Sequence, residues 1–200
     1  MRLLIIGAGS HAKVVIDIAA IQYDIVGCVG DKEGTLLGYP VYTQPVEADV
    51  CFVAIGDNYT RQKVTELQTL PLVTIVDPSS RISCYSTIGA GSFIGSHVSV
   101  GVDCTIGKGC ILNTNSHIDH DGVMQEYASL APGVTVCGSV TIGSRSAICA
   151  GATIIHRIYI GQDTVIGAGS TVLDHARSSV VEYGTPSRFV RERVASDPYL

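Results

Sequence analysis

The sequence has no cluster of lysine or arginine, although it contains 13 of these residues against 18 Asp and Glu. A formal net charge of −5 argues against a nucleic-acid-binding surface, because such a surface needs clustered positive charge to contact phosphates. No apolar run approaches the length of a membrane span, since Leu3–Ile6 and Cys51–Ile55 are only as long as strands. The first residues do not have the layout of a signal peptide either. These absences predict a soluble, cytoplasmic protein.

A disulfide or zinc framework is also missing. The chain has seven cysteines, but no C-x-x-C pair. Cys104 and Cys110 occupy a position where neighbouring units of sequence have Ser or Ala, and Cys28 and Cys51 lie in predicted core strands. We therefore predict free thiols that fill small buried spaces.

The dominant pattern is a six-residue repeat that runs without interruption from Ile82 to Arg177. Each unit begins with Ile, Val, Leu or Met, and its fifth residue is mostly Ser, Ala or Cys. A fixed short period, in which each unit exposes an apolar side until its neighbours stack on it, is typical of a parallel β-helix. Three units per triangular coil would bring residues one coil apart in sequence to within about 4.8 Å along the stack.

The first 78 residues have a different pattern, in which short apolar runs alternate with amphipathic stretches. Strands are predicted at 2–6, 24–29, 50–55 and 72–76, and helices at about 11–21 and 59–69. This alternation predicts a small α/β unit with a parallel sheet. We therefore divide the chain into a Rossmann-like domain, 1–78, and a β-helix domain, 79–200, which ends in a tail with a short helix.

A glycine loop, Gly7-Ala8-Gly9, separates the first predicted strand from the first helix. Loop N–H groups and the helix N-terminus favour an anion at such a place. Asp31, which follows the second strand, could accept hydrogen bonds from a ribose or a base. Because 78 residues supply only one mononucleotide half, the pattern favours a nucleotide sugar over NAD. A tight turn without a ligand remains the alternative.

The repeat changes character over 112–135, where four consecutive units lack the glycine that other units carry at their second position. Polar residues replace it and its neighbours, namely Asn113, Asn115, His117, Asp119, His120, Asp121 and Glu126. Residue 138, a glycine, would stand beside His120 in the next coil. A histidine with a carboxylate partner, Asp121 or Asp119, and an exposed N–H nearby is the layout of general-base acyl transfer.

Two other interpretations of this patch remain open. His120 could be one of six histidines without a function. His97, His117 and His120 could also form a zinc site like that of the β-helical carbonic anhydrases. His97 is not in column with the other two, so such a site would have to be shared between subunits.

The motifs IIGAGSHAKVVIDI, AIGDNYTR, NTNSHIDHD, LAPGV and YGTPSR, together with the hexad array, resemble one family over almost the whole chain. This family is the NeuD/PglD-like sugar acyltransferases, which are left-handed β-helix enzymes that use acetyl-CoA. The resemblance implies a homotrimer, with acetyl-CoA between neighbouring β-helices and the nucleotide sugar in the N-terminal domain. The left hand of the helix is implied by the family alone, because parallel crossovers are otherwise right-handed.

The resemblance also implies roles for individual residues. The catalytic pair is His120, the base, and Asp121, its acidic partner. Substrate-binding residues are Gly7, Gly9, Ser10, Asp31, Lys32, Gly56, Asn58 and Asn113. Acetyl-CoA-binding residues are Gly138, Ser129, Gly151, Ala168 and Pro186. Two positions depart from the family, since Ser129 stands where relatives often have a second histidine and Ser10 where many have glycine.

These observations favour an acetyl-CoA-dependent N-acetyltransferase that acts on a UDP- or GDP-linked 4-amino-4,6-dideoxy sugar in bacterial surface glycan synthesis. The amine would attack the thioester directly, and no metal is expected. The alternative on the same fold is a sialic acid O-acetyltransferase. A zinc enzyme like the γ-carbonic anhydrases and a non-catalytic nucleotide-binding scaffold are the alternatives from other classes.

Overall fold

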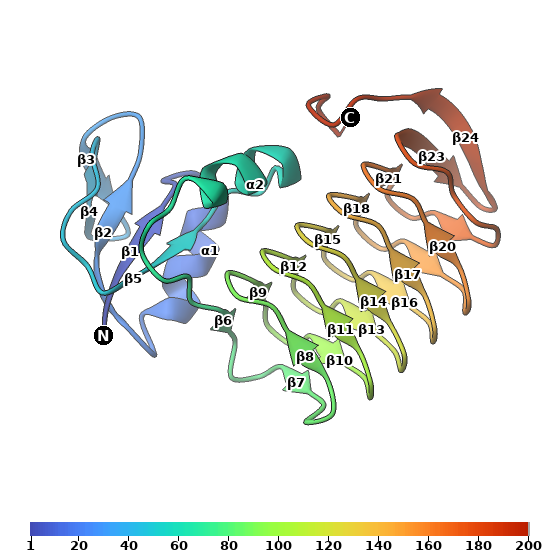
Figure 1. The fold of residues 1–200 in the computed structure, drawn as a ribbon, viewed down its shortest axis with the longest axis horizontal. Coiled ribbons are helices and arrows are strands. Elements are labelled where there is room, and N and C mark those ends of the chain that lie inside the picture. The colour runs from blue at the N-terminus through green and yellow to red at the C-terminus, as the bar shows by residue number, and fades with distance from the viewer. Residues whose placement is uncertain (200) are drawn as a thin grey trace.

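Two structural units follow each other along the chain, an α/β unit and a stack of short parallel strands (Figure 1). The computed structural model describes residues 1–199. Leu200, the last residue of the predicted tail, lies outside the described part. Neither helix within residues 1–199 is long and apolar enough to cross a membrane.

The α/β unit is built on a five-stranded sheet with the order β3-β4-β2-β1-β5. Its elements are β1 (Arg2–Ile6), α1 (Ser10–Ala19), β2 (Asp24–Val29), β3 (Gly34–Leu36), β4 (Tyr39–Tyr42), β5 (Val50–Val53) and α2 (Asn58–Glu66). All neighbouring strands pair parallel except those of the β3–β4 hairpin. The predicted parallel sheet is therefore confirmed, although the sequence did not indicate the hairpin.

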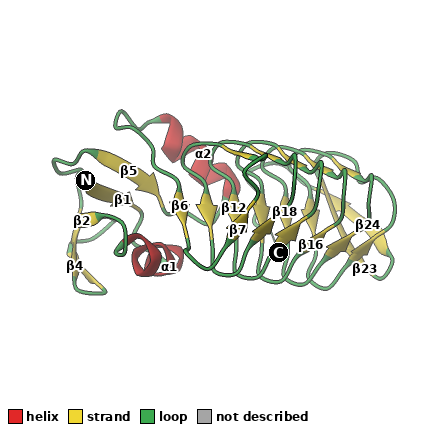
Figure 2. Ribbon diagram, turned by 90° about the horizontal axis from the view of Figure 1, so that it is seen from below, coloured by secondary structure: helices red, strands yellow, loops and turns green. Residues whose placement is uncertain are grey.

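The two helices cover opposite faces of this sheet (Figure 2). Successive residues of a strand point to opposite faces, so Leu3 packs in the layer of α1 and Leu4 in the layer that includes Val64 of α2. The α1 layer does not end at the sheet. It continues onto Ile75, Phe93 and Ile111 of the β-helix, so the two units share one apolar core.

The β-helix has three faces of parallel two-residue strands, which we number in the order in which the chain visits them. The first face contains β6 (Ile75–Val76), β9 (Phe93–Ile94), β12 (Ile111–Leu112), β15 (Ser129–Leu130), β18 (Ala147–Ile148) and β21 (Val165–Ile166). The second contains β7 (Arg81–Ile82), β10 (Ser99–Val100), β13 (His117–Ile118), β16 (Thr135–Val136), β19 (Thr153–Ile154) and β22 (Thr171–Val172). The third contains β8 (Thr87–Ile88), β11 (Thr105–Ile106), β14 (Val123–Met124), β17 (Thr141–Ile142) and β20 (Tyr159–Ile160).

The corners between these faces carry the residues of interest. The first corner joins the first face to the second, the second corner joins the second to the third, and the third corner leads back to the first face. Strand pairs confirm the predicted register, since His117 pairs with Thr135 and Thr135 with Thr153. Side chains one coil apart therefore lie above one another.

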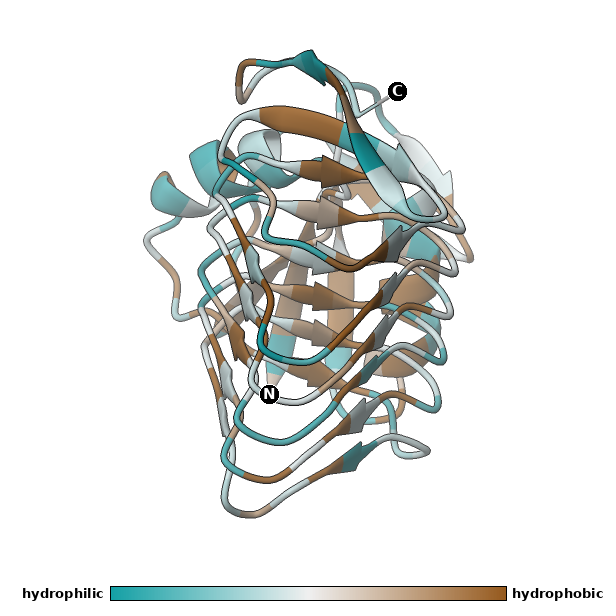
Figure 3. Cartoon of the chain, turned by 90° about the vertical axis from the view of Figure 1, so that its right-hand side faces the viewer, coloured by the Kyte–Doolittle hydropathy of each residue, from teal (hydrophilic) through white to brown (hydrophobic). Residues whose placement is uncertain are grey.

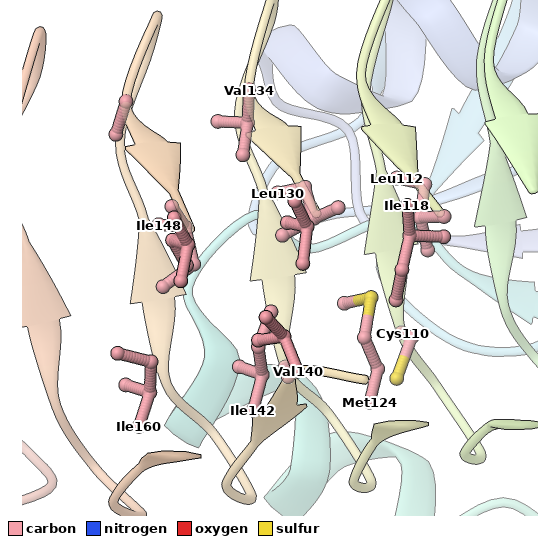
Figure 4. Close-up of a cluster of buried hydrophobic side chains, with 14 of the residues drawn as sticks. Cys110, Leu112, Ile118, Met124, Leu130, Val134, Val140, Ile142, Ile148 and Ile160 are labelled. Carbon is pink, nitrogen blue, oxygen red and sulfur yellow. The ribbon is translucent and has the colours of Figure 1, made fainter. Parts of the chain in front are cut away.

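The aliphatic first positions of the hexads fill the interior (Figure 4). From Ile94 to Val172 every one of them is at most 2% exposed. Viewed along the stack, the strands of the β-helix are largely hydrophobic (Figure 3). Cys28, Cys51, Cys104 and Cys110 are buried free thiols, as predicted.

The fourth hexad position has a conformational property that the sequence analysis missed. Its residues turn the chain at the corners with a positive φ, which is about 57° at Asp121 and 73° at Gly91. Glycine occupies this position in only some units, and Asp, Asn, His, Arg, Ser or Tyr occupies it in others. Asp and Asn tolerate this left-handed conformation better than most residues. The corner backbone thus turns at Asp121, next to His120.

Two predictions about element boundaries were wrong. The fourth predicted strand, 72–76, does not join the N-terminal sheet beyond a single bridge between Cys51 and Leu72. Its last residues form β6 and pair with β9, so the β-helix begins before residue 79. The predicted terminal helix is instead an antiparallel hairpin of β23 (Val180–Gly184) and β24 (Ser187–Glu192), which extends the first face through β21.

Candidate active site

His120 lies at the second corner, between β13 and β14, with its side chain 58% exposed. Its Nδ1 atom is 2.7 Å from Oδ2 of Asp121. An ionised carboxylate can only accept hydrogen bonds, so Nδ1 carries the proton and donates a hydrogen bond to Asp121. The lone pair of Nε2 then faces away from the carboxylate. This tautomer is the one that a general base needs.

The same corner raises the basicity of His120. The hydrogen bond that Nδ1–H donates to Asp121 raises the pKa of the imidazole above its usual 6.5, and the negative charge of Asp119 raises it further. Both effects stabilise the imidazolium that forms when the ring accepts a proton. The ring is therefore a stronger base than a free histidine.

Gly138 lies directly beside the imidazole in the next coil. A Cβ atom at this position would come within 2.5 Å of both Cε1 and Nε2 of His120. Only glycine leaves the ring in place. The Gly138 N–H donates to no acceptor within residues 1–199, and Gly138 itself is buried beside the exposed ring.

The glycine loop forms a separate cavity of about 920 Å³ in the α/β unit. It collects Gly7, Gly9, Ser10, Asp31, Lys32 and Gly56, which are six of the eight predicted substrate-binding residues. Gly7 has a φ of 117°, and a Cβ there would lie 2.9 Å from the carbonyl oxygen of Ala54. The loop closes tightly for this reason and directs the N-terminus of α1 into the cavity.

A second cavity, of about 620 Å³, lies between α1 and the first face of the β-helix. It shares Ser10, His11 and Gly56 with the first cavity, and Asn113 and Ser129 line its β-helix side. Most of its remaining lining is apolar, formed by Val14, Ile111, Leu130, Ala131 and Pro198. A ligand held at the glycine loop could extend into this space without leaving the protein.

Asn58, the remaining predicted substrate-binding residue, has a different environment. It is only 1% exposed, and its Nδ2 donates to Ser129 Oγ and to the carbonyls of Arg145 and Ser146. Its Oδ1 accepts from Arg61, and its backbone N–H donates to the hydroxyl of Tyr199. The Asn58 side chain thus joins α2 to the third corner and lines neither cavity.

Arg61 is the most deeply buried charge of this junction, with 1% exposure. Its guanidinium donates to the carbonyls of Ile55, Gly56, Gly109 and Tyr127 as well as to Asn58. Burial lowers its pKa from the usual value, and no carboxylate contacts it among residues 1–199. Nothing in the sequence indicated this role, because a single arginine on a predicted helix is normally exposed.

His11, at the start of α1, was not predicted either. It lines both cavities, and its ring meets Phe93 edge-on with a centroid distance of 5.1 Å. Burial, with a smaller contribution from Arg61, lowers the pKa of His11 to about 4. The ring is therefore neutral near pH 7.

The predicted acetyl-CoA residues do not gather at one place within one chain. Gly138 lies at the second corner with His120 and Asp121, whereas Gly151 and Ala168 lie at the first corner in the coils above Asn113. Ser129 is in the first face, and Pro186 is in the turn between β23 and β24. Among residues 1–199, no group of three or more His, Cys, Asp or Glu side chains is arranged to hold a metal ion.

A parallel β-helix with an exposed histidine–carboxylate pair at one corner and a glycine-loop cavity in an appended α/β unit defines an acyltransferase of the hexapeptide-repeat class. Comparison with known proteins narrows this class. Residues 2–67 match the PglD N-terminal domain. A GDP-perosamine N-acetyltransferase from Escherichia coli is 29% identical over 163 residues, which cover 72% of this chain and 73% of the relative.

Solved structures agree over nearly the full length. A perosamine N-acetyltransferase variant from Caulobacter crescentus, in complex with CoA and GDP-perosamine, matches with 31% identity and a TM-score of 0.91, over 96% of this chain and 98% of that one. The acetyltransferase domain of PglB from Neisseria gonorrhoeae, in complex with acetyl coenzyme A, matches with 27% identity and a TM-score of 0.89, over 94% and 98%. The chain belongs to the PglD-type acetyltransferases, which have a left-handed β-helix.

Proposed function

We propose that this protein transfers the acetyl group of acetyl-CoA to the amine of a nucleotide-linked 4-amino-4,6-dideoxy sugar. The observation that carries the proposal is the 2.7 Å contact between His120 Nδ1 and Asp121, which leaves Nε2 as a base beside Gly138. The E. coli relative is a GDP-perosamine N-acetyltransferase, which supports a GDP-linked amino sugar as the first acceptor to test.

The two cavities support a division of the acceptor into two parts. The nucleotide diphosphate would occupy the glycine-loop cavity, where the N-terminus of α1 and Lys32 favour negative charge. The sugar would extend into the second cavity, whose apolar lining suits the methyl group that a 6-deoxy sugar has at C6. Asn113 would provide a polar contact there.

The reaction needs one base and one N–H donor. The sugar amine attacks the thioester carbonyl, and Nε2 of His120 accepts a proton from the amine nitrogen as the C–N bond forms. The Gly138 N–H stabilises the negative charge on the carbonyl oxygen. When the C–S bond breaks, the imidazolium returns the proton to the CoA thiolate.

Completion of the site requires a second chain. In a triangular coil, the second corner is opposite the first face, and the second cavity lies on the first face. One chain therefore cannot bring its own His120 to its own cavity. We propose a homotrimer in which the cavity of each subunit is served by His120 of the partner subunit, with acetyl-CoA between the two β-helices. Both co-substrates are cytoplasmic metabolites, so we place the reaction in the cytoplasm.

The test is release of free CoA thiol from acetyl-CoA with a panel of acceptors. The panel contains GDP- and UDP-linked 4-amino sugars, CMP-sialic acid and free sialic acid. We expect turnover on an amino sugar and a loss of roughly 10²–10⁴-fold in kcat for His120→Ala. The exposed His156 provides the control variant His156→Ala, which should keep full activity. Full activity of His120→Ala, or turnover on sialic acid alone, would refute the proposal.

A further inference from the structure

A second carboxylate stands beside the reactive nitrogen of His120. Oδ2 of Asp119 lies 4.0 Å from Nε2, whereas Asp121 contacts the other ring nitrogen, Nδ1. The Asp119 side chain is 47% exposed, so it can reach a ligand that approaches Nε2. In the proposed reaction Asp119 acts only through its charge on His120 and makes no contact with the acceptor.

The position of Asp119 is fixed by its own backbone surroundings. Its Oδ1 accepts the N–H of His120 at 2.8 Å, and its N–H donates to the carbonyl of Val136 at 2.9 Å. Below it lies Gly101, where a Cβ would come within 2.8 Å of the Asp119 carbonyl carbon. With Oδ1 held by the His120 amide, Oδ2 is the oxygen left free on the Nε2 side.

Nε2 and Oδ2 together present two hydrogen-bond acceptors 4.0 Å apart. A single donor atom can lie about 2.9 Å from both, which is the usual hydrogen-bond distance. A primary amine has two N–H groups for these acceptors and keeps its lone pair free for attack. A hydroxyl has only one O–H, so one of its lone pairs would face the Asp119 carboxylate.

We propose that Asp119 is a specificity-determining residue that selects a primary amine over a hydroxyl as the acetyl acceptor. This inference rests on the proposed function, because it requires His120 to be the base. It goes further because a second hydrogen-bond acceptor beside Nε2 explains why the group that receives the acetyl is an amine.

The step balances without any further reactant. The neutral amine nitrogen forms the C–N bond, and the electron pair of the carbonyl π bond moves to oxygen. One N–H proton passes to His120 Nε2, while the other N–H remains bonded to Asp119 and stays in the amide product. The C–S bond then breaks, and the thiolate takes the proton from His120. Asp119 accepts the second N–H before and during attack, so it contributes to binding of the amine.

The variant Asp119→Asn tests this role with minimal disturbance. The amide Oδ1 of asparagine can still accept the His120 N–H, so the corner keeps its turn. The atom beside Nε2 changes from an acceptor to an N–H₂ donor, which can bond a hydroxyl oxygen but not an amine hydrogen. The control is Asp17→Asn, the same change at an exposed position of α1.

The measurement is the affinity of two ligands in the presence of CoA, which cannot react. One ligand is the GDP-linked 4-amino sugar and the other is its 4-hydroxy counterpart. Wild type and Asp17→Asn should bind the amine at least about 10-fold more tightly. In Asp119→Asn the ratio should fall to about one or reverse. Asp119→Glu, which restores an acceptor, should recover part of the preference.

A second readout separates this role from a purely structural one. In Asp119→Asn, kcat/KM for the amine should fall about 10- to 100-fold, mainly through KM. The acidic limb of its pH profile should also move to lower pH, since the charge of Asp119 raises the pKa of His120. An unchanged ratio of amine to hydroxyl affinity in Asp119→Asn would overturn the inference. If wild type still acetylates the amine, the proposed function remains intact. Failure of wild type to acetylate any amine would refute both.

Discussion

His120 and Gly138 lie one coil apart in the same column, so close that a methyl group on Gly138 would occupy the space of the imidazole, 2.5 Å from Nε2. The base of the proposed reaction therefore depends on a residue that has no side chain. The hexad register brings the two together, because residues in equivalent positions of successive coils stack.

Replacement of this glycine should disable the base without unfolding the protein. Gly138→Ala must displace the ring from Asp121 or from the acceptor, and we expect kcat to fall by about 100-fold, the usual cost of a small misplacement. The change in melting temperature should be small beside this loss. Gly34→Ala is the control, since a Cβ at Gly34 meets nothing within 4 Å. Wild-type kcat in Gly138→Ala would contradict the assignment of His120.

The pH dependence of kcat/KM should report the Asp121 contact. Activity requires neutral His120, whose pKa lies above its usual 6.5, so kcat/KM should rise with pH through a midpoint above this value. Asp121→Asn removes the largest cause of the raised pKa of His120. The acidic limb of the pH profile should therefore shift to lower pH, and kcat should fall. Steady-state rates from pH 5 to 9, measured on both proteins, check this. A limb that stays in place would show that another group titrates.

Two inactive variants should complement each other if the site lies between chains. Gly9 lines the glycine-loop cavity and a Cβ there meets no atom within 4 Å, so Gly9→Leu should fold but block the nucleotide. Trimers that contain both Gly9→Leu and His120→Ala chains should then regain about a third of wild-type turnover, because one site in each such trimer combines an intact cavity with an intact His120 of the partner subunit.

The mixed trimers are made by co-expression with two affinity tags, and homotrimers of each variant serve as controls. No activity in the mixture would mean that each site uses a single chain. A monomer in light scattering would remove the trimer as well.

The buried guanidinium of Arg61 should be the main stabiliser of the junction between the two units. Arg61→Met would leave five acceptors without their donor, and we expect a loss of about 3–5 kcal/mol in the free energy of unfolding. Arg2→Met is the matched control, because its ion pair with Glu47 is exposed and should contribute less than about 1 kcal/mol. The measurement is the free energy of unfolding of wild type, Arg61→Met and Arg2→Met in denaturant. Equal losses in both variants would contradict it.

His11 should make the protein less stable in acid. Its pKa is lowered to about 4 in the folded chain, whereas the unfolded chain keeps the usual 6.5. Between these values the unfolded state binds a proton that the folded state does not. Stability should therefore fall as pH drops from 6.5 towards 4, by up to about 3 kcal/mol from this residue.

His11→Gln cannot titrate, so its unfolding midpoint should fall less between pH 7 and pH 4.5 than that of wild type. His156→Gln, at an exposed position, should behave like wild type. An identical acid dependence in His11→Gln and wild type would show that other groups cause it.

The sequence by itself determined the β-helix and the internal geometry of each coil. A six-residue period fixes both the buried position and the column of every residue, so the neighbourhood of His120 and Gly138 followed from counting. The glycine loop was equally local, because Gly7 and Gly9 shape a turn between one strand and the next helix. Periodic and local sequence patterns are enough to predict the structure where contacts repeat at a fixed spacing or join residues that are close along the chain.

Only the tertiary structure decided how the two units meet. Asn58 bonds to Ser129 and Arg145, and Arg61 to Gly109 and Tyr127, across separations that no period predicts. The same applies to Ile75, which a strand pattern placed in the first sheet and which packs instead at the start of the β-helix. These contacts depend on which faces of two folded units fit together, and that fit is a property of their surfaces in space. It gave Asn58 and Arg61 a structural role and put the cavity of each chain opposite its own base.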